Sequence, residues 1–315
     1  MAPTFPPVVF TADKDTDGVV ELYASFNDGT EIIKLSGTMV LGGDVVDFKV
    51  SPDGIYVAYV ADQDTDGVFE LYAVPVDKTP AETAVKISGS IPIGGSGIKE
   101  VATGTGDYFF AWAPDSSRSS RVAYIADQRF ADVFELFTNL PDGSDNVRVS
   151  GDLVAGGDVD AFVWSPQSDR IVYRADQSIN DALELYTAFP SYLGSQRITS
   201  GFDPGENTRQ FGWSPTIINL EQRIAFIADK DIPGLFQLYT TSPNNSNNVL
   251  VSSVTPAGGN VNEFAWSPNG ELLAYRGETR TVGIDELFTT RRTLPDIKPL
   301  SFLIPIGGDV LDFAW

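Results

Sequence analysis

The sequence contains no cysteine and no histidine, and its 21 basic side chains are outnumbered by 43 acidic ones. The missing residues exclude disulfides, thiolate nucleophiles, zinc sites of the usual kind and histidine general bases. Metals bound by oxygen atoms are the class that remains. The net charge of −22 repels nucleic acid and anionic lipid, so we expect no nucleic-acid partner.

Long hydrophobic runs are also missing, because no segment reaches the roughly 18 apolar residues of a membrane span. We therefore expect no membrane insertion. The first residues, MAPTFPPVVF, contain no basic region followed by a long apolar stretch, so this sequence shows no export signal. We favour an extracytoplasmic location (secreted, periplasmic or at the cell surface), although a cytosolic protein without a leader shares these features. The default oligomeric state is a monomer.

One repeated pattern organises the chain. Between Phe48 and Tyr72 it reads FKVSPDGIYVAYVADQDTDGVFELY, which predicts three short strands joined by a Ser-Pro-Asp-Gly turn and an acidic loop. With 42% apolar residues the chain can fill a core. Counted at the first residue of the Glu-Leu-Tyr segment, the pattern recurs at Glu21, Glu70, Glu135, Glu184, Gln237 and Glu286.

The spacing between repeats is nearly constant. From this marker to the end of the next unit's first strand is 29 residues in five of six cases, such as Glu21 to Val50, which indicates structural repeats. A fourth strand, ending in sequences such as KLSG, completes each unit. The lysine or arginine in most of these strands is typical of an outer strand guarded against association.

These repeats predict an all-β protein: a six-bladed β-propeller of four-stranded antiparallel blades, in a single domain over residues 1–315. The chain begins at a second strand, Val8 to Thr11, and ends with a first strand, Val310 to Trp315. Pairing residues 310–315 with the N-terminal blade would complete that blade and close the ring. The alternative, an open solenoid, normally carries polar capping repeats, and the sequence shows none.

The segments FAWSPNGELLAYR and VSPDGIYVAYVAD resemble the Trp-Ser-Pro-Asp-Gly repeats, called WD40-like or PD40, of TolB and its six-bladed propeller family. The resemblance covers nearly the whole chain, and its motif recurs in every unit. It implies the fold. The family is functionally broad, and the separate N-terminal domain of TolB has no room here, so the resemblance implies no particular task.

In a propeller, the second-to-third-strand connections and the connections between units emerge on one side, here called the acidic-loop side. The other turns emerge on the opposite side, here called the turn side. The loops DKDTDGVVE and DQDTDGVFE resemble the calcium loops of integrin-type propellers, with oxygen ligands at positions 1, 3, 5, 7 and 9. An EF-hand is excluded, because position 12 is Ala24 or Ala73 instead of glutamate. The predicted Ca²⁺ ligands are Asp13, Asp15, Asp17, the Val19 carbonyl and Glu21, and Asp62, Asp64, Asp66, the Val68 carbonyl and Glu70.

The alternative to calcium is a solvated acidic turn. Position 1 is acidic in every unit and position 9 in all but one, so these two positions also suit hydrogen bonds that tie the hairpin. Four further acids lack that explanation, and their mutual repulsion favours a bound cation. They are Asp15, Asp17, Asp64 and Asp66.

Gly-Gly-Asp segments connect several units on the same side. We expect their glycines to permit a close approach of the backbone to the crowded inner strand. The acids of these segments would make the mouth of a central channel electronegative, so weak binding of a cation or an amine is the second interpretation. These acids are Asp44, Asp158 and Asp309.

One connection is longer than the others. Glu70 and Trp112 are separated by 42 residues, and ten of the extra residues follow Gly95. Long loops on a rigid scaffold often carry binding specificity. We expect the 96–108 insertion to be the main recognition loop, and a neutral loop extension is the alternative.

No nucleophile elbow, phosphate loop or paired-carboxylate signature stands out from the repeat. We therefore expect no enzyme but a calcium-stabilised module that binds a protein or carbohydrate partner through the acidic-loop side and the 96–108 insertion. The alternative is a polysaccharide-active, lyase-like enzyme with its site at the propeller mouth. Lyases that look similar in fold rely on histidine, which is missing here. Arg174 and Arg276 suit anionic sugars, but salt bridges to the acidic loops explain them equally well.

Overall fold

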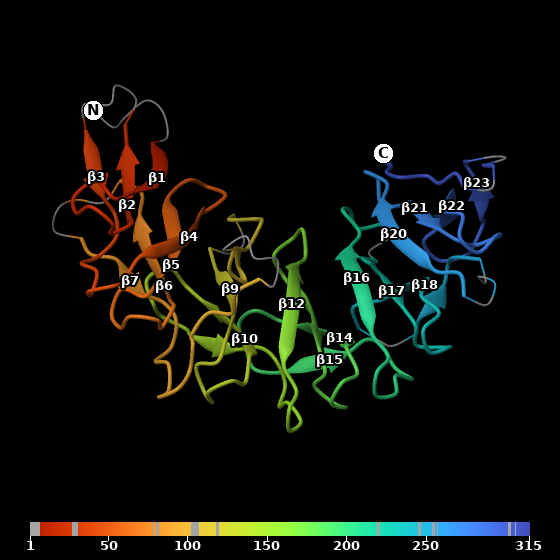
Figure 1. Ribbon diagram of the computed structural model, residues 1–315, viewed down its shortest axis with the longest axis horizontal. Coiled ribbons are helices and arrows are strands. Elements are labelled where there is room, and N and C mark those ends of the chain that lie inside the picture. The colour runs from red at the N-terminus through yellow and green to blue at the C-terminus, as the bar shows by residue number, and fades with distance from the viewer. Residues whose placement is uncertain are drawn as a thin grey trace. The chain divides into compact units, whose positions relative to one another are not determined.

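The computed structural model describes residues 7–26, 31–77, 79, 82–101, 107–117, 120–218, 221–244, 247–253, 256, 258–301, 304–305 and 307–315. In these residues the chain forms 23 strands and no helix (Figure 1). The strands pair into six sheets whose neighbours are antiparallel and consecutive in the chain. The predicted all-β fold of six repeated antiparallel sheets is confirmed.

The first three sheets contain eleven strands. They are β1 (Val8–Ala12), β2 (Glu21–Ser25) and β3 (Ile32–Lys34); β4 (Val45–Val50), β5 (Tyr56–Ala61), β6 (Glu70–Pro75) and β7 (Val85–Lys86); β8 (Phe110–Trp112), β9 (Val122–Ala126), β10 (Glu135–Asn139) and β11 (Val147–Arg148).

The last three sheets contain twelve strands. They are β12 (Val159–Trp164), β13 (Ile171–Ala175), β14 (Glu184–Ala188) and β15 (Ser195–Arg197); β16 (Thr208–Trp213), β17 (Ile224–Ala228), β18 (Gln237–Thr241) and β19 (Val249–Leu250); β20 (Val261–Trp266), β21 (Leu272–Gly277), β22 (Glu286–Arg291) and β23 (Lys298–Pro299).

The first sheet has three strands, whereas each of the other five has four. Its missing member is the inner strand, for which the sequence predicts residues 310–315. That pairing is not among the strand pairs that the structure describes, and residues 310–315 carry no strand assignment. Closure of the ring therefore stays a prediction.

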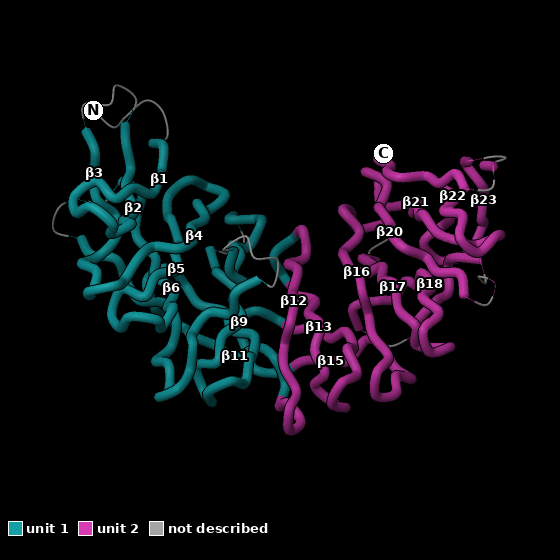
Figure 2. Tube along the Cα trace, viewed as in Figure 1, with its two compact units in different colours: residues 1–151, 167–169, 189–194 teal, residues 152–166, 170–188, 195–315 magenta. Residues whose placement is uncertain are grey.

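The chain divides into two compact units, shown in different colours in Figure 2. Unit 1 comprises residues 1–151, 167–169 and 189–194, and it holds the sheets β1–β3, β4–β7 and β8–β11. Unit 2 comprises residues 152–166, 170–188 and 195–315, and it holds the remaining three sheets. The tips of two turns in the β12–β15 sheet thus group with unit 1.

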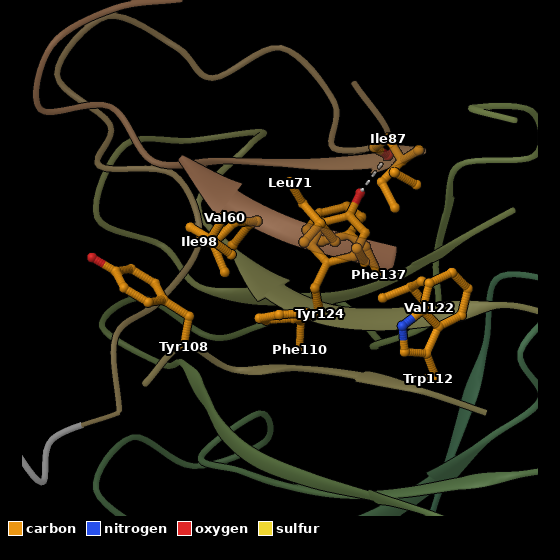
Figure 3. Packing of buried hydrophobic residues seen from close by; sticks show 13 residues of the cluster. Val60, Leu71, Ile87, Ile98, Tyr108, Phe110, Trp112, Val122, Tyr124 and Phe137 are labelled. Atoms are coloured by element: carbon orange, nitrogen blue, oxygen red, sulfur yellow. Dashed lines mark hydrogen bonds between the residues drawn. The ribbon is translucent and has the colours of Figure 1, made fainter. Parts of the chain in front are cut away.

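The second strand of each sheet explains the core, because its consecutive apolar residues can be buried on both faces. In β5, Val57 and Tyr59 pack toward the β1–β3 sheet with Leu22. The alternate residues Ala58 and Val60 pack with residues of the β8–β11 sheet in a second cluster. Figure 3 shows this second cluster, in which residues from both sheets interdigitate.

Aromatic side chains on the second and third strands stack across each sheet. The two rings stand directly opposite in the strand register, as Tyr59 and Tyr72 do in β5 and β6. Such cross-strand pairs are a main source of sheet stability. The six stacked pairs are Phe10 with Tyr23, Tyr59 with Tyr72, Tyr124 with Phe137, Tyr173 with Tyr186, Phe226 with Tyr239 and Tyr275 with Phe288.

The tryptophan that ends the inner strand ties one sheet to the previous one. In unit 1, the Trp112 indole nitrogen donates to the Lys49 carbonyl at 2.7 Å. In unit 2, the Trp213 indole donates to the Val163 carbonyl at 3.1 Å. Both acceptors immediately precede the last residue of the neighbouring inner strand. The repeated tryptophan therefore fixes sheet-to-sheet packing.

Candidate binding surface on the acidic-loop side

The Gly-Gly pairs on this side are needed for close packing against the next acidic loop. Gly42 has a positive φ of 92°, which favours glycine. A Cβ on Gly43 would lie 2.7 Å from the Asp62 carbonyl oxygen, and one on Gly157 would lie 2.6 Å from the Asp176 carbonyl. The predicted close approach is confirmed, but its partner is the acidic loop and not the inner strand.

The acid that follows each glycine pair joins consecutive sheets. Asp44 Oδ1 accepts the Val20 backbone N–H at 2.6 Å, and Asp309 Oδ1 accepts the Asp285 N–H at 2.8 Å. In the β20–β23 sheet, Asn260 plays the same part for Phe236 N at 2.8 Å. An amide works as well as a carboxylate, so these side chains serve as hydrogen-bond acceptors. Cation or amine binding at a ring of these acids stays a prediction.

The first acid closes the hairpin turn in five of the six loops, from the second loop to the sixth. Asp62 accepts two backbone N–H groups, from Asp44 at 2.7 Å and from Gly67 at 2.9 Å. Asp127 does the same for Ser96, Gly97 and Asp132. Both carboxylates are buried, and buried carboxylates with several N–H donors stabilise the loops that supply those donors.

The ninth residue of the loop is paired inside its own sheet. Glu70 accepts the Tyr72 hydroxyl at 3.1 Å and the Lys86 ammonium at 3.0 Å. Glu21 accepts the Tyr23 hydroxyl at 2.8 Å and forms an ion pair with Lys34. Position 9 in both loops and position 1 in the second loop therefore form hydrogen bonds that hold the hairpin, and whether they also bind calcium stays a prediction.

Lysines neutralise the acids at position 3 of both predicted calcium loops. Lys86 lies 3.0 Å from Asp64 as well as 3.0 Å from Glu70. Burial alone would lower the pKa of Lys86, but its hydrogen bonds to the two carboxylates outweigh burial and raise it. The hydrogen bond from Lys14, at 2.8 Å, lowers the pKa of Asp15. Each lysine thus partly offsets the negative charge of the carboxylate beside it.

The side chains as they stand do not converge on a cation. Among the described residues no group of three or more acids is arranged to hold a metal ion. In the second loop, both oxygens of Asp62 accept backbone N–H groups. The fifth-position acids, Asp17 and Asp66, are exposed. Calcium binding would require Lys86 and its carboxylate partners to rearrange, and it stays a prediction.

A groove of about 470 Å³ lies beside the second acidic loop. One wall is this loop, and the other is the connection that enters the third sheet. At its rim the Ile93 side chain is fully exposed, and so is Leu41 on the preceding connection. We call this feature the Lys86 groove. It is lined by Asp64, Thr65, Val68, Glu70, Lys86, Ser90, Ile91, Pro92, Ile93, Gly94 and Gly95.

The 96–108 insertion begins directly after the groove. Ile98 pairs with Ala126 of β9, just as Val45 pairs with Ala61 in the second sheet. The second sheet has only a register irregularity after this position, between Val45 and Asp47, whereas here the chain leaves the sheet. We call the segment 99–109 the finger.

The base of the finger is a short antiparallel ladder. Glu100 bridges Tyr108, and the Val101 N–H donates to the Asp107 carbonyl at 2.8 Å. Residues 102–106, which belong to the predicted recognition loop, lie outside the described residues. An insertion at a bulge lengthens the strand edge without disturbing the ladder behind it.

Contacts with the second sheet anchor the finger. Lys49 donates to the Tyr108 and Phe110 carbonyls at 3.2 and 3.0 Å, and its ammonium lies 4.0 Å from the Phe110 ring centroid. The Tyr108 N–H donates to Asp47 at 3.1 Å, and the Tyr108 ring packs 5.3 Å from Phe69. Burial raises the pKa of Tyr108 to about 12, and Figure 3 shows this side chain beside Ile98. These anchors could not be predicted from the sequence, because Lys49 and Asp47 are distant from the finger in the chain.

No family model matches the sequence, and no curated protein matches it. Among solved structures, dipeptidyl peptidase 4 of Porphyromonas gingivalis is similar at 14% identity, with 94% of this chain and 44% of that chain covered and a TM-score of 0.58. Prolyl oligopeptidase B of Galerina marginata is similar at 12% identity, with 95% and 42% covered and a TM-score of 0.52. At these identities the likeness shows the fold alone, and this chain spans less than half of either peptidase.

The fold is a six-bladed β-propeller. A putative TolB from Agrobacterium tumefaciens is also similar, at 14% identity over 86% of this chain and 84% of that chain, with a TM-score of 0.42. A score this low adds no argument to the motif resemblance. Among the described residues of the propeller, no helix is long and apolar enough to cross a bilayer.

Two arginines of the propeller were candidates for binding anionic sugars. Arg174 donates to both Asp160 oxygens, at 2.8 and 2.7 Å, and to the Thr208 carbonyl at 2.6 Å. Arg276 donates to Asp285 at 2.9 Å. Both guanidinium groups therefore form salt bridges within unit 2. That of Arg276 is to Asp285, at the end of an acidic loop, as expected if these arginines form salt bridges instead of binding sugars.

Proposed function

We propose that this chain is a non-catalytic binding module, which takes a protein partner on the acidic-loop side of unit 1, at the Lys86 groove and the finger. The observation that carries the proposal is the full exposure of Leu41 and Ile93. Both side chains sit on connections whose backbones are held by hydrogen bonds, at Gly43 and Gly95. A partner that covered these two side chains would remove their apolar surface from water, which favours binding.

The residue types favour a protein over a carbohydrate on this side. Leu41 and Ile93 are aliphatic, so they offer no flat ring on which a sugar could stack. Exposed carboxylates surround them, among them Asp64 and Asp66. A complementary partner would present apolar side chains with basic residues around them, and its association should weaken as the salt concentration rises. A carbohydrate partner is the second outcome of the test.

The test uses affinity capture from the source envelope fraction, followed by a titration with the captured partner. Ile93→Asp and Leu41→Asp should each weaken binding by at least about tenfold, because a charge replaces a buried apolar contact. Val163→Asp is the control, since Val163 is also exposed but lies on β12 of unit 2. Unchanged affinity of both the Ile93→Asp and the Leu41→Asp variants would contradict the proposal.

Removal of the finger is a second test of the same surface. Ser96 and Gly97 donate to the buried Asp127, so they must stay. Joining Lys99 to Tyr108 through a two-glycine linker removes residues 100–107 and spares those contacts. The variant should fold and bind the partner more weakly. An unchanged dissociation constant would show that the insertion is a neutral extension.

The competing function is cleavage of an acidic polysaccharide at the propeller mouth. The engagement of Arg174 and Arg276 in ion pairs supports the non-catalytic alternative. Incubation with polygalacturonate in the presence of Ca²⁺ should release no unsaturated product. Suppose instead that unsaturated product is released, and that Arg174→Ala abolishes the release while Ile93→Asp retains it. That result would contradict the binding proposal and support a lyase.

We also propose that Ca²⁺ stabilises the first two acidic loops. Loops of extracellular modules often bind calcium at about 10⁻⁴ to 10⁻³ M, so the sites would fill only outside the cytoplasm, which is the location we propose. A ligand at 100 times its dissociation constant stabilises the native state by about 2.7 kcal/mol per site. Melting should therefore occur at a higher temperature in Ca²⁺ than in EDTA.

Two variants separate calcium from a general effect of the acids. The combined substitution Asp15→Asn with Asp64→Asn should remove the Ca²⁺ response. Asp132→Asn in the third loop should keep it, because that position lies outside the predicted ligands and its positive φ of 61° is one that asparagine tolerates. Identical melting curves of the unmodified protein in Ca²⁺ and in EDTA would contradict calcium binding. The acids would then belong to a solvated turn whose charge is offset by lysine.

A further inference from the structure

A cavity of about 570 Å³ opens on the turn side, away from the surface described above. It is built by the turns after β8 and β10 together with the turn tips 167–169 and 189–194, all within unit 1. Its walls combine aromatic rings with side chains that can form hydrogen bonds. The lining residues are Ser120, Arg121, Leu140, Gln167, Ser168, Asp169, Phe189, Pro190, Ser191 and Tyr192.

An aromatic platform forms one wall. The rings of Phe189 and Tyr192 stack with centroids 5.1 Å apart and an interplanar angle of 24°. Tyr192 keeps 54% of its surface exposed. The turn that carries both rings is held in place, because the Thr138 hydroxyl donates to the Pro190 carbonyl at 2.5 Å. The platform is therefore fixed before any ligand arrives, which reduces the ordering cost of binding.

The polar groups at the base are positioned and charge-balanced. Arg121 is buried, donates to Thr138 at 3.3 Å and forms an ion pair with Asp145. The Ser168 hydroxyl accepts the Asp115 N–H at 2.7 Å, which fixes the turn that also carries Gln167. The guanidinium is thus already neutralised, and the base offers no net positive charge to an anion.

Gln167 supplies the observation that points to a ligand. Its side-chain oxygen is buried, and within the described part of the chain no donor reaches it. A buried acceptor without a donor destabilises the free protein. Gln167 lines the cavity, so a rotation of its side chain would let a ligand hydroxyl donate to this oxygen, while the apolar face of the ligand covers the exposed Tyr192 ring.

We propose that this cavity binds a pyranose residue of a neutral glycan. A pyranose combines the two features required here, a C–H face that stacks on an aromatic ring and hydroxyls that donate and accept hydrogen bonds. The serine hydroxyls of Ser120 and Ser191 add partners at the rim. The net charge of −22 disfavours acidic sugars. This site is independent of the protein-binding proposal, because it lies on the opposite side of the strands.

The test is titration of the full-length chain with neutral hexasaccharides: cellohexaose, laminarihexaose, mannohexaose, maltohexaose and chitohexaose. At least one should bind with saturation at millimolar concentration or below. Tyr192→Ala should weaken that binding by at least about fivefold, the scale of one aromatic contact. Gln167→Leu should weaken it as well, and Tyr192→Trp should retain it.

Phe130→Ala is the matched control, because Phe130 is equally exposed, at 57%, but belongs to an acidic loop of the same unit. Its affinity should equal that of the unmodified chain. Melting curves of each variant establish that it is folded. Lack of saturable binding by all five hexasaccharides overturns the proposal, as does binding that Tyr192→Ala and Gln167→Leu leave unchanged. The proposal would also be overturned if decaproline bound and none of the hexasaccharides did. The aromatic platform would then be assigned to a proline-rich peptide.

Discussion

The first residue of the third strand shows how charge is balanced in each sheet. Five sheets have glutamate there, and the partner changes with its neighbours. Where the residue two positions later is Phe137, and so lacks a hydroxyl, Arg129 donates to Glu135 at 2.8 Å. Where the fourth strand has Leu250 opposite Tyr239 instead of a cation, the acid itself is replaced by Gln237. The acids at this position therefore serve the fold.

Among the glutamates at the start of the third strand, Glu184 is the one whose negative charge is least compensated. Its side chain is fully buried, and one carboxylate oxygen lacks a donor in the part of the chain that the structure describes. Burial raises the pKa of Glu184 above its ordinary value of 4.5, and the Arg197 guanidinium, at 3.3 Å and nearly half exposed, opposes this only in part. The folded state therefore binds the proton more tightly than the unfolded state.

We expect Glu184→Gln to raise the free energy of unfolding at neutral pH, by about 1 kcal/mol, because the amide needs no counter-ion in this buried place. The gain should shrink as the pH falls through the folded pKa toward 4.5, since protonation neutralises the carboxyl of the unmodified protein there. Urea unfolding at several pH values measures this. A gain that does not depend on pH would mean that the effect is one of packing.

The reverse substitution, Gln237→Glu, is the control. Gln237 accepts the Tyr239 hydroxyl at 3.1 Å, and the fourth strand offers Leu250 where four of the other five sheets have lysine or arginine. The variant should lose stability at neutral pH and regain it on acidification. Equal stability of both proteins at pH values on either side of 4.5 would contradict the charge-balance interpretation.

At the scale of elements, the serine or threonine that follows the fourth strand has a single explanation in all six sheets. Its hydroxyl accepts the backbone N–H of the leucine on the third strand, at 2.9 to 3.2 Å. The fourth strand has only two or three residues. This hydrogen bond therefore continues the pairing of the fourth strand with the third strand beyond the end of the fourth strand. The acceptors are Ser36, Ser88, Ser150, Thr199, Ser252 and Ser301.

Ser150→Ala should therefore destabilise the protein by about 1–3 kcal/mol, because the Leu136 N–H is left buried without an acceptor. Ser150→Thr should cost much less, since Thr199 fills the same role at 2.9 Å. Thermal unfolding of both variants measures the difference. Equal losses would show that the site responds to volume and not to the hydrogen bond.

The strands could be predicted from the sequence because their signal is local: alternating turns, apolar runs and a constant spacing. The place of the insertion after Gly95 followed from the same count. The partners of the acids could not be predicted, because they come from other parts of the chain. Lys86 meets Asp64 from 22 positions away, and Lys49 reaches the Phe110 carbonyl from 61. The sequence thus located the acidic loops but not the lysines beside their third-position acids, and calcium binding there stays a prediction.

At the scale of the whole molecule, the last residues behave like an inner strand that lacks a second strand beside it. The Trp315 indole donates to the Ala265 carbonyl at 3.1 Å, the same tie that Trp112 and Trp213 make. Arg276 donates to the Val310 carbonyl at 3.2 Å. In unit 2 the segment 309–315 therefore makes the contacts expected of the first strand of a further sheet, while in unit 1 the described strands of the β1 sheet do not include a first strand.

We predict that residues 310–315 pair with β1, and the repeats set the register. In the other five sheets the inner-strand phenylalanine stands opposite the stacked aromatic of the second strand, as Phe162 does with Tyr173. The equivalent residues here are Phe313 and Phe10, which places Ala314 opposite Val9. The chain contains no cysteine, so an introduced pair reports on this register alone.

The double variant Val9→Cys with Ala314→Cys should form an intramolecular disulfide under mild oxidation, because opposite residues of antiparallel strands bring their Cβ atoms to about 4.5–5.5 Å. Val9→Cys with Leu311→Cys, three residues out of register, should not, and neither pair should form one in urea. Deletion of residues 310–315 should cost several kcal/mol, as loss of a packed tryptophan does, and should speed amide exchange in β1 as well as in β20. Ring closure is wrong if the in-register pair stays reduced, or if deletion leaves exchange in β1 unchanged, because the segment would then stabilise unit 2 alone.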